Sequence, residues 1–275
     1  MTRRLLPVVL WGSLTLTTLF LAVPLLALFL RVPPAELVAQ LGSETARTAL
    51  LLSLETSLIA HALVLAIGTP AAYLLATRRF SGRALLVSAL ELPIVLPPAV
   101  AGIALLAAFG RGGLLGDELQ ALGISIPFTT LAVVLAICFV ASPFYLRAAI
   151  AAFEGVDVRL VEASRTLGAG PARTFRRVVV PLAAAGLGAG STLAFARGLG
   201  EFGATIMFAG SFPGRTQTAP LAIYASLDED PKVGFALGAL LVLTSVAVLA
   251  LAKLIPSWSR YTSISPIGSE RSLST

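Results

Sequence analysis

Charged residues are scarce in this chain. Asp, Glu, Lys and Arg together make up 12% of its 275 residues, which is about half of their share in an average soluble domain. Hydrophobic residues reach 57%, and the mean hydropathy is +0.91. A soluble fold of this length cannot bury so much apolar surface. We therefore expect lipid to face most of the chain, which excludes a soluble enzyme, a disordered protein and a disulfide-rich secreted domain.

Cysteine and histidine each occur once, as Cys138 and His61. This excludes an internal disulfide and any zinc or iron–sulfur site built from several Cys and His residues. An intramembrane enzyme would need a Ser/His pair, paired Asp residues or a metal at membrane depth. His61 has no second His to act with, and every Asp falls in a predicted loop: Asp117, Asp157, Asp228 and Asp230. The sequence therefore disfavours an intramembrane enzyme.

Long apolar runs dominate what is present. A bilayer core about 30 Å thick requires ~20 apolar residues of helix. Six continuously apolar stretches meet this length: 5–30, 48–76, 84–109, 129–150, 181–199 and 233–255. The first run is longer than the apolar part of a signal peptide and contains Pro24, so we expect an uncleaved span. The sequence thus predicts an all-α membrane protein with six transmembrane helices.

Positive charge is divided unequally between the two sets of loops. Fourteen of the 20 Lys and Arg residues lie in the N-terminus, the 77–84 and 147–180 loops and the C-terminal end. Five lie in the opposite set: Arg31, Arg47, Arg111, Arg215 and Lys232. Because cytoplasmic loops carry the excess of Lys and Arg, we expect both termini and loop 147–180 to be cytoplasmic. The basic pI of 10.2 then reflects topology, and nucleic-acid binding has no support.

The 147–180 loop is predicted to form two short helices. Asp157 suits the N-cap of the first helix, and an apolar stripe follows at helical spacing: Leu160, Val161, Ser164 and Leu167. Gly168 lies where a helix ends, and Pro171 lies where the second helix begins. The stripe is compatible with a helix lying on anionic lipid or with a docking element for a cytoplasmic partner.

The spacing of this loop matches a known motif. Glu162-Ala163-Ser164, three residues, Gly168, nine residues and then Val178-Val179-Val180-Pro181 resembles the EAA loop of ABC importer permeases. Ser164 replaces the third Ala of that motif. The resemblance implies that the loop docks on a separate cytoplasmic ATPase. The sequence is consistent with a separate ATPase subunit, because neither of its two lysines lies in a P-loop pattern. The chain is therefore not expected to be an enzyme or to hold a cofactor, and ATP and Mg²⁺ would belong to the partner.

Three further stretches narrow the resemblance. Residues 92–98 (LPIVLPP), 153–157 (FEGVD) and 194–206 (AFARGLGEFGATI) followed by 213–218 (PGRTQT) are similar to permeases of molybdate ABC transporters. Sulfate/thiosulfate permeases share the LGEFGA core and remain the alternative. The resemblance covers 48–255, the permease domain with its coupling loop 154–181. Residues 1–47 would add an N-terminal helix with an external loop, and 256–275 a cytoplasmic tail.

The resemblance also implies an assembly. It predicts a type I importer fold in the bacterial inner membrane, a homodimer of this chain, two cytoplasmic ABC ATPase subunits, and an extracytoplasmic protein that delivers molybdate or tungstate. A membrane sensor or structural protein is the alternative from another class, and such a protein would have no reason to carry a docking loop.

Candidate pathway residues follow from the chemistry of an oxyanion, which favours positive charge, neutral donors and accessible backbone. Arg197 and Glu201 are four residues apart and face each other on a helix. Gly200 and Gly203 would permit a helix break or close packing. Pro97 and Pro98 must break or kink the third span. An external run rich in donors completes the set: Arg215, Thr216, Gln217 and Thr218.

Overall fold

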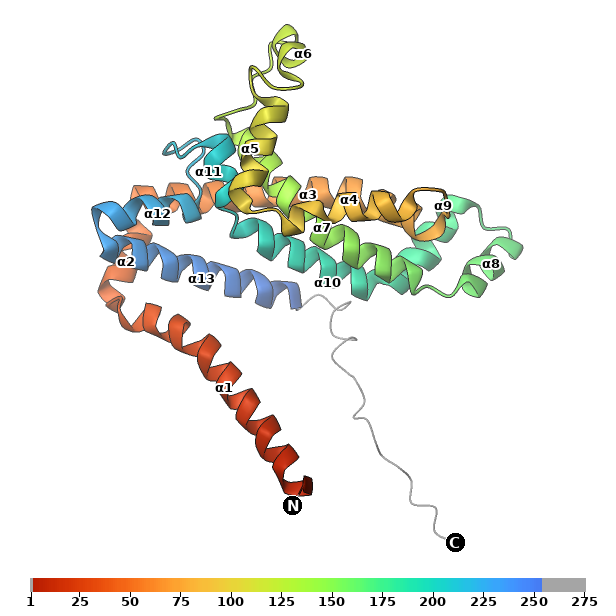
Figure 1. Ribbon diagram of the computed structural model, residues 1–275, viewed down its shortest axis with the longest axis horizontal. Coiled ribbons are helices and arrows are strands. Elements are labelled where there is room, and N and C mark those ends of the chain that lie inside the picture. The colour runs from red at the N-terminus through yellow and green to blue at the C-terminus, as the bar shows by residue number, and fades with distance from the viewer. Residues whose placement is uncertain (1, 254–275) are drawn as a thin grey trace. The chain divides into compact units, whose positions relative to one another are not determined.

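The computed structural model describes residues 2–253, and all regular structure within that range is helical (Figure 1). Five helical stretches in it are long and apolar enough to cross a membrane: Leu6–Leu30, Glu44–Thr77, Thr130–Glu154, Pro171–Leu199 and Pro231–Val248. A sixth span results if the bent pair Arg83–Val95 and Pro98–Phe109 is counted as one. The predicted fold class, an all-α protein with six spans, is confirmed.

Four of the six predicted spans correspond to single helices. They are α1 (Thr2–Leu30), α3 (Glu44–Thr77), α7 (Thr130–Glu154) and α13 (Pro231–Lys253). The last two residues of the predicted sixth span, and the predicted cytoplasmic tail 256–275, lie outside the described residues. Short helices between the spans were not predicted: α2 (Pro34–Gly42), α6 (Gly116–Ala121), α11 (Gly203–Ala209) and α12 (Ala219–Glu229).

The third predicted span is broken, which is the larger of the two effects that its prolines predicted. It consists of α4 (Arg83–Val95) and α5 (Pro98–Phe109), whose axes differ by 116°. Leu96 and Pro97 both precede a proline, which pushes their backbone towards extended conformations, and their ψ angles are 135° and 134°. Because two consecutive residues leave the helical region, α5 starts in a new direction.

The fifth predicted span starts earlier than expected. Helical structure runs from Pro171 to Leu199 through α9 (Pro171–Thr174), the π-helical turn η1 (Phe175–Val179) and α10 (Val180–Leu199). Pro181 therefore lies inside a continuous helix and not at its first residue. A proline here would clash with the carbonyl four residues earlier in an α-helix. The wider π-turn, in which Val180 N–H donates to Phe175 O, precedes Pro181 directly and relieves this crowding.

The described chain forms two compact units. The first comprises Met1–Ser53 and Ser211–Thr244. Its small core contains Ala46, Ala49, Ala222 and Leu237. The Oγ atom of Ser53 accepts a hydrogen bond from the backbone N–H of Ala219 at 2.7 Å, which satisfies a free donor at the start of α12. The apolar side chains of α1 are largely exposed, as suits a helix surrounded by lipid.

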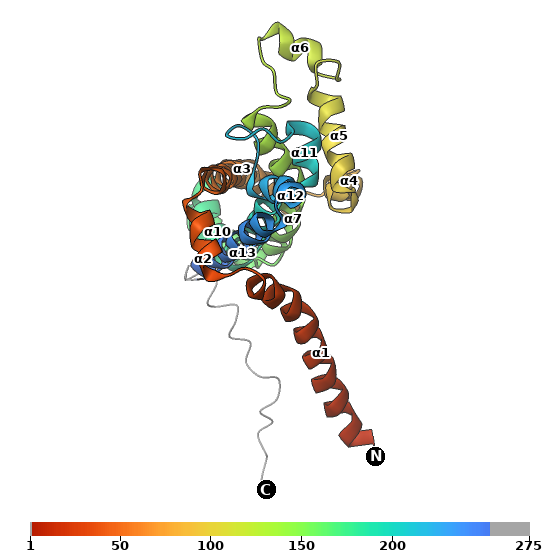
Figure 2. The same ribbon diagram turned by 90° about the vertical axis from the view of Figure 1, so that its left-hand side faces the viewer.

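The second unit comprises Leu54–Gly210 and residues 245–253. Helices α7 and α10 run side by side in both ribbon views (Figures 1 and 2). Glycines allow this close approach: a Cβ atom on Gly186 would lie 2.6 Å from the Cβ of Ala152, and one on Gly190 would lie 2.5 Å from the Cβ of Ala148. Gly186 and Gly190 therefore serve the packing of α10 on α7.

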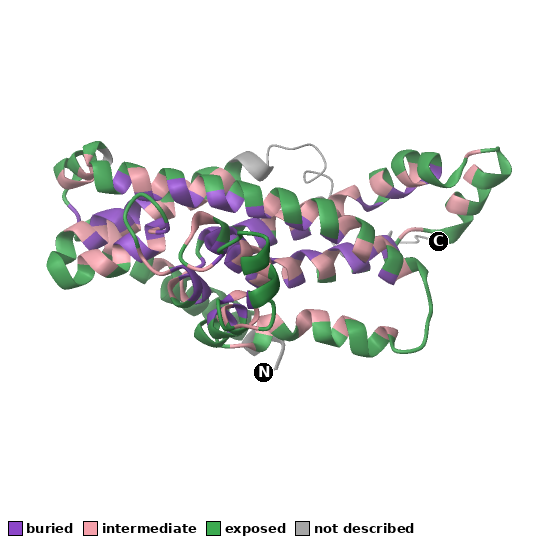
Figure 3. Cartoon of the chain, turned by 90° about the horizontal axis from the view of Figure 1, so that it is seen from above, coloured by how far each residue is buried: buried purple, intermediate pink, exposed green. Residues whose placement is uncertain are grey.

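Helix α7 is the centre of the second unit. It has the largest buried share of the candidate spans and contacts α4, α5, α10 and α11. In Figure 3 buried residues alternate with exposed ones along the long helices of this unit, as expected for helices that bury one face. The segment that contains α8 (Val158–Thr166), at the right of that view, is mostly exposed. It is therefore the part of this unit best placed to meet a partner.

Candidate functional site

Residues 154–181, called here the coupling segment, begin with a capped helix. The N–H of Arg159 donates to Oδ1 of Asp157 at 2.9 Å, and the Arg159 guanidinium lies 2.9 Å from the same carboxylate. The hydrogen bonds from the Arg159 side chain and then from its backbone lower the pKa of Asp157. Asp157 is thus ionised at the positive end of the α8 dipole. The predicted capping role of Asp157 is confirmed.

Gly168 ends this helix in the predicted way. Its φ is +82°, a left-handed conformation that favours glycine. Gly168 N–H donates to Arg165 O at 2.9 Å, and Ala169 N–H donates to Ser164 O at 3.1 Å. This pair of bonds is the Schellman arrangement of a helix end. The turn reverses the chain and brings α8 next to α9.

Ser164, the residue that departs from the family motif, links the two helices. Its Oγ lies 3.1 Å from Oγ1 of Thr174, which is buried and also hydrogen-bonds to Ala169 O. An alanine at 164 would leave the Thr174 hydroxyl with only the longer of these bonds. Serine in place of the motif's alanine therefore adds a contact that fixes the angle between α8 and α9.

Leu160 and Leu167 form an exposed apolar face of this segment, whereas Val161 is half-buried against the core around α7. Leu167 is 87% exposed and Leu160 is also exposed, as is the side chain of Glu162. An open groove beside them is lined by Leu160, Ala163, Ser164, Leu167, Ala169, Arg173, Arg177, Val178, Pro181 and Leu182. Apolar side chains of this size favour a protein or lipid surface over water. The groove can accept an apolar partner, and its two arginines can pair with acidic groups.

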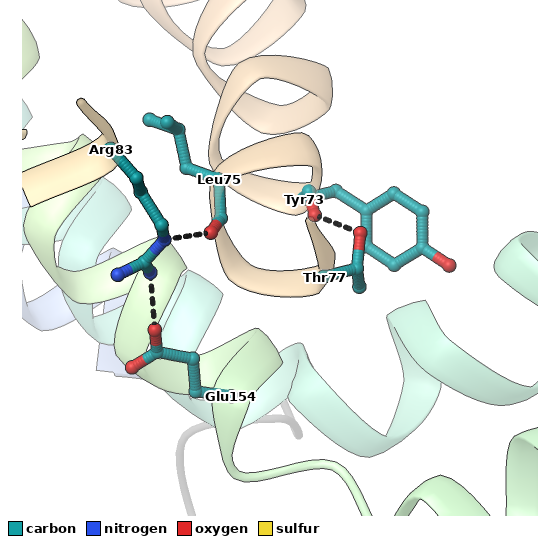
Figure 4. Close-up of polar contacts among 5 residues, drawn as sticks. All are labelled: Tyr73, Leu75, Thr77, Arg83 and Glu154. Carbon is teal, nitrogen blue, oxygen red and sulfur yellow. Dashed lines mark hydrogen bonds and ion pairs between the residues drawn. The ribbon is translucent and has the colours of Figure 1, made fainter. Parts of the chain in front are cut away.

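The two ends of the coupling segment are held together on α3. The rings of Tyr73, Phe153 and Phe175 form a cluster with centroid distances of 4.7 to 6.1 Å. Arg83 adds a polar contact to the same region, because its Nη2 lies 2.6 Å from Oε1 of Glu154 (Figure 4). Sequence reasoning did not single out this pair, and no local signal could have done so, since the two residues are 71 positions apart.

The second group of predicted residues lies where α10 meets α11. Arg197 Nη2 is 2.7 Å from Oε2 of Glu201, whose side chain is 1% exposed, against 29% for Arg197. The other carboxylate oxygen of Glu201 accepts the N–H of Ala204 at 2.8 Å. Glu201 thus caps α11 while it neutralises Arg197 at the end of α10, and both charges suit the adjacent helix dipoles. The predicted pairing is confirmed, although the helix ends at Leu199, between the two residues.

The predicted proline and glycine residues also meet at this junction. A Cβ atom on Gly203 would lie 2.5 Å from the Cβ of Pro98, and one on Gly102 would lie 2.6 Å from the carbonyl oxygen of Ala204. The start of α5 therefore packs on the start of α11 with almost no space between backbones. The structure brings Pro97, Pro98, Gly203, Glu201 and Arg197 into one region of the second unit.

The other four predicted pathway residues belong to the first unit. Arg215 is exposed, whereas Thr216 and Thr218 are buried. The hydroxyl of Thr216 accepts the N–H of Phe212 at 3.0 Å, and Gln217 Nε2 donates to Ser211 Oγ at 3.3 Å. Thr216 therefore stabilises its own loop. Arg215 keeps its predicted position on an exposed surface, and its role stays a prediction.

Comparison with known sequences finds relatives over nearly all of the chain. A family model described as "Binding-protein-dependent transport system inner membrane component" matches residues 65–260. The molybdenum transport system permease protein ModB of Mycobacterium tuberculosis is 47% identical over 236 residues, covering 84% of this chain and 87% of the relative. ModB of Escherichia coli K12 is 44% identical over 211 residues, covering 76% and 91%.

Solved structures show the same architecture. A chain of a bacterial alginate ABC transporter, crystallised with a periplasmic protein, has a TM-score of 0.71 at 14% identity, with 90% of this chain and 92% of that chain covered. At this identity the likeness concerns the fold alone. Together with the apolar helices, these matches identify a multi-pass protein of the inner membrane. The chain belongs to the family of binding-protein-dependent transport system inner membrane components, the permeases of ABC importers.

Proposed function

We propose that this chain is the permease subunit of an ATP-driven importer of molybdate, with tungstate as a second substrate. The identity of 47% with the molybdenum permease of M. tuberculosis, over 84% of the chain, carries this proposal. The stretches 194–206 and 213–218 support it, because they also resemble molybdate permeases. The sulfate/thiosulfate permeases, which share the LGEFGA core, supply the alternative substrate.

The proposed complex contains two copies of this chain, two cytoplasmic ATPase subunits and an extracytoplasmic molybdate-binding protein. The coupling segment would face the cytoplasm, in line with the excess of Lys and Arg in its set of loops. Its exposed Leu160 and Leu167 and the groove beside them would dock on the ATPase. ATP binding would bring the two ATPases together, and the coupling segments would transmit this movement to the membrane helices.

Arg197 is the residue that we propose to meet the anion. Its guanidinium has five N–H donors, and Nη2 is the nitrogen that lies closest to Glu201. The rest of the group is partly accessible, so a tetrahedral dianion can approach it. Glu201 would lower the net positive charge and thereby keep the anion from binding too tightly to leave. Gly200, Gly203, Pro97 and Pro98 would form the adjoining wall or gate.

The test is the ATPase activity of the purified complex with its binding protein and each anion in turn. We expect molybdate and tungstate, delivered by the binding protein, to stimulate hydrolysis, and sulfate to leave it at the basal rate. Stimulation by sulfate alone would favour the sulfate/thiosulfate alternative. Failure of the chain to bind any ATPase would contradict both assignments and favour a sensor or structural role.

A further inference from the structure

Arg83 connects three helices at one point. It is the first residue of α4, and its Nε donates to the carbonyl oxygen of Leu75 at 2.6 Å, in the last turns of α3 (Figure 4). Its Nη2 donates to Oε1 of Glu154, the last residue of α7, also at 2.6 Å. Carbonyls near a helix C-terminus lack helical donors and attract cations. A single side chain thus joins the ends of α3 and α7 to the start of α4.

This point lies where the coupling segment begins. Glu154 is its first residue, and the neighbouring Phe153 packs edge-on against Tyr73 of α3. Phe175, in the turn η1 of the coupling segment, packs against Tyr73 with 4.7 Å between the ring centroids. A displacement of the coupling segment at its α7 end must therefore act on Glu154, which Arg83 holds.

Helix α4 lies on the outside of α7, and two ion pairs join these helices. None of its residues, Arg83–Val95, is buried. A second ion pair, between Glu91 Oε1 and Arg147 Nε at 3.8 Å, lies further along the same two helices. The half-buried Val87 and Leu90 add apolar contact with the core around α7. With two charge pairs and a thin apolar contact, α4 can follow the end of α7 without being part of the core.

The far end of α4 reaches the α10–α11 junction. Helix α4 ends at Val95, the break at Leu96 and Pro97 follows, and Pro98 then contacts Gly203. Gly203 lies two residues after Glu201, the partner of Arg197. If α4 moves as a rigid helix, a movement at Arg83 also shifts Pro98 at its other end. Because α5 and α11 are in close contact at Pro98 and Gly203, this shift would reach α11.

We propose that Arg83 is a positioning residue that couples the coupling segment to the junction of α5, α10 and α11, with α4 as the connecting lever. This inference rests on the function proposed above. The Arg83–Glu154 pair is partly exposed, with 30% and 48% of the two side chains accessible, and such pairs contribute little to stability. Its loss should therefore impair coupling without unfolding the protein.

The test compares Arg83→Gln with Arg79→Gln in the purified complex in liposomes. Arg79 is exposed in the same loop, so both variants remove one positive charge from one surface. The measured quantities are the amount of complex, the rate of ATP hydrolysis and the molybdate imported per ATP. We expect Arg83→Gln to lower import per ATP about threefold or more at a normal amount of complex, and Arg79→Gln to match the wild type.

Exchange of the two charges provides the second variant. Arg83→Glu and Glu154→Arg should each lower import per ATP, and the double variant should recover a large part, because the ion pair is restored while the bond to Leu75 is lost. Wild-type import per ATP in Arg83→Gln would overturn the inference. So would a parallel loss of complex, hydrolysis and import in every variant, which indicates a structural role alone. A wild-type complex that imports no molybdate would instead remove the proposed function, and the inference with it.

Discussion

The guanidinium of Arg197 lies 2.7 Å from the carboxylate of Glu201, yet the two side chains differ sharply in accessibility, at 29% and 1%. Glu201 also caps α11 through the N–H of Ala204. The carboxylate is therefore buried between a backbone N–H and a counter-charge, whereas the guanidinium is partly accessible. Substitution of Arg197 and substitution of Glu201 should therefore differ in their effect on the stability of the protein.

We predict that Arg197→Ala destabilises the protein more than Glu201→Gln does. Arg197→Ala leaves a buried carboxylate without its counter-charge, which costs about 3–5 kcal/mol. Glu201→Gln leaves an amide oxygen that still accepts from Ala204, and the remaining arginine is accessible. Thermal unfolding of the purified variants measures the difference, with the exposed Arg78→Ala as the control. Equal stability of the two variants would show that accessibility does not decide the effect.

Gly203→Ala should impair both stability and transport. The new Cβ would stand 2.5 Å from the Cβ of Pro98, so α5 and α11 must separate, at a cost of about 1–3 kcal/mol. Gly200→Ala is the matched control, because its Cβ would meet nothing closer than 3.9 Å. Molybdate uptake should fall further in the first variant than in the second, in which the new Cβ clashes with nothing. Normal uptake by Gly203→Ala would mean that this contact is not part of the gate.

Gly168→Ala should disturb the coupling segment through backbone conformation alone. No atom lies within 4 Å of the position of a Cβ there, but the φ of +82° costs an alanine about 1–2 kcal/mol. Gly170→Ala is the control, since its φ is −68° and its Cβ position is also open. We expect weaker binding of the ATPase subunit in Gly168→Ala only, and a milder effect for Gly168→Asn. Identical binding by the two alanine variants would argue against a role for the turn.

The cap of α8 should resist acidification. Hydrogen bonds from Arg159 lower the pKa of Asp157 in the folded state, so its contribution is complete above the unfolded value of about 3.9 and is lost only as pH falls through the lower, folded value. Hydrogen exchange of the α8 amides, corrected for the intrinsic effect of pH, should show constant protection from pH 7 to about 4.5. Asp157→Asn should keep the helix capped. Loss of protection already near neutral pH would contradict this account of the cap.

Local signals in the sequence predicted much of the fold and of the coupling segment. The apolar runs located the spans, because the bilayer sets their length, and Asp157 and Gly168 mark helix ends through their own backbone chemistry. The same kind of signal gave the Arg197–Glu201 pair, whose members are four positions apart.

Contacts between distant parts of the chain could not be predicted from local sequence signals. Pro97 and Pro98 predicted a break or a kink, but the angle between α4 and α5 depends on the packing of α5 against Gly203. The π-turn before Pro181 extended a helix that the proline was expected to begin. The Arg83–Glu154 pair joins helices that only the tertiary structure brings together.

The most direct test of the account is the accessibility of residue 167, where Leu167 is 87% exposed on the coupling segment. Leu167→Cys in a Cys138→Ala background is treated with a membrane-impermeant maleimide in right-side-out and inverted vesicles, with and without the ATPase subunit. The account predicts labelling in inverted vesicles only, and protection of the thiol when the ATPase is bound. Labelling in right-side-out vesicles, or labelling that the ATPase does not reduce, would contradict the claim that this segment couples a membrane permease to a cytoplasmic motor.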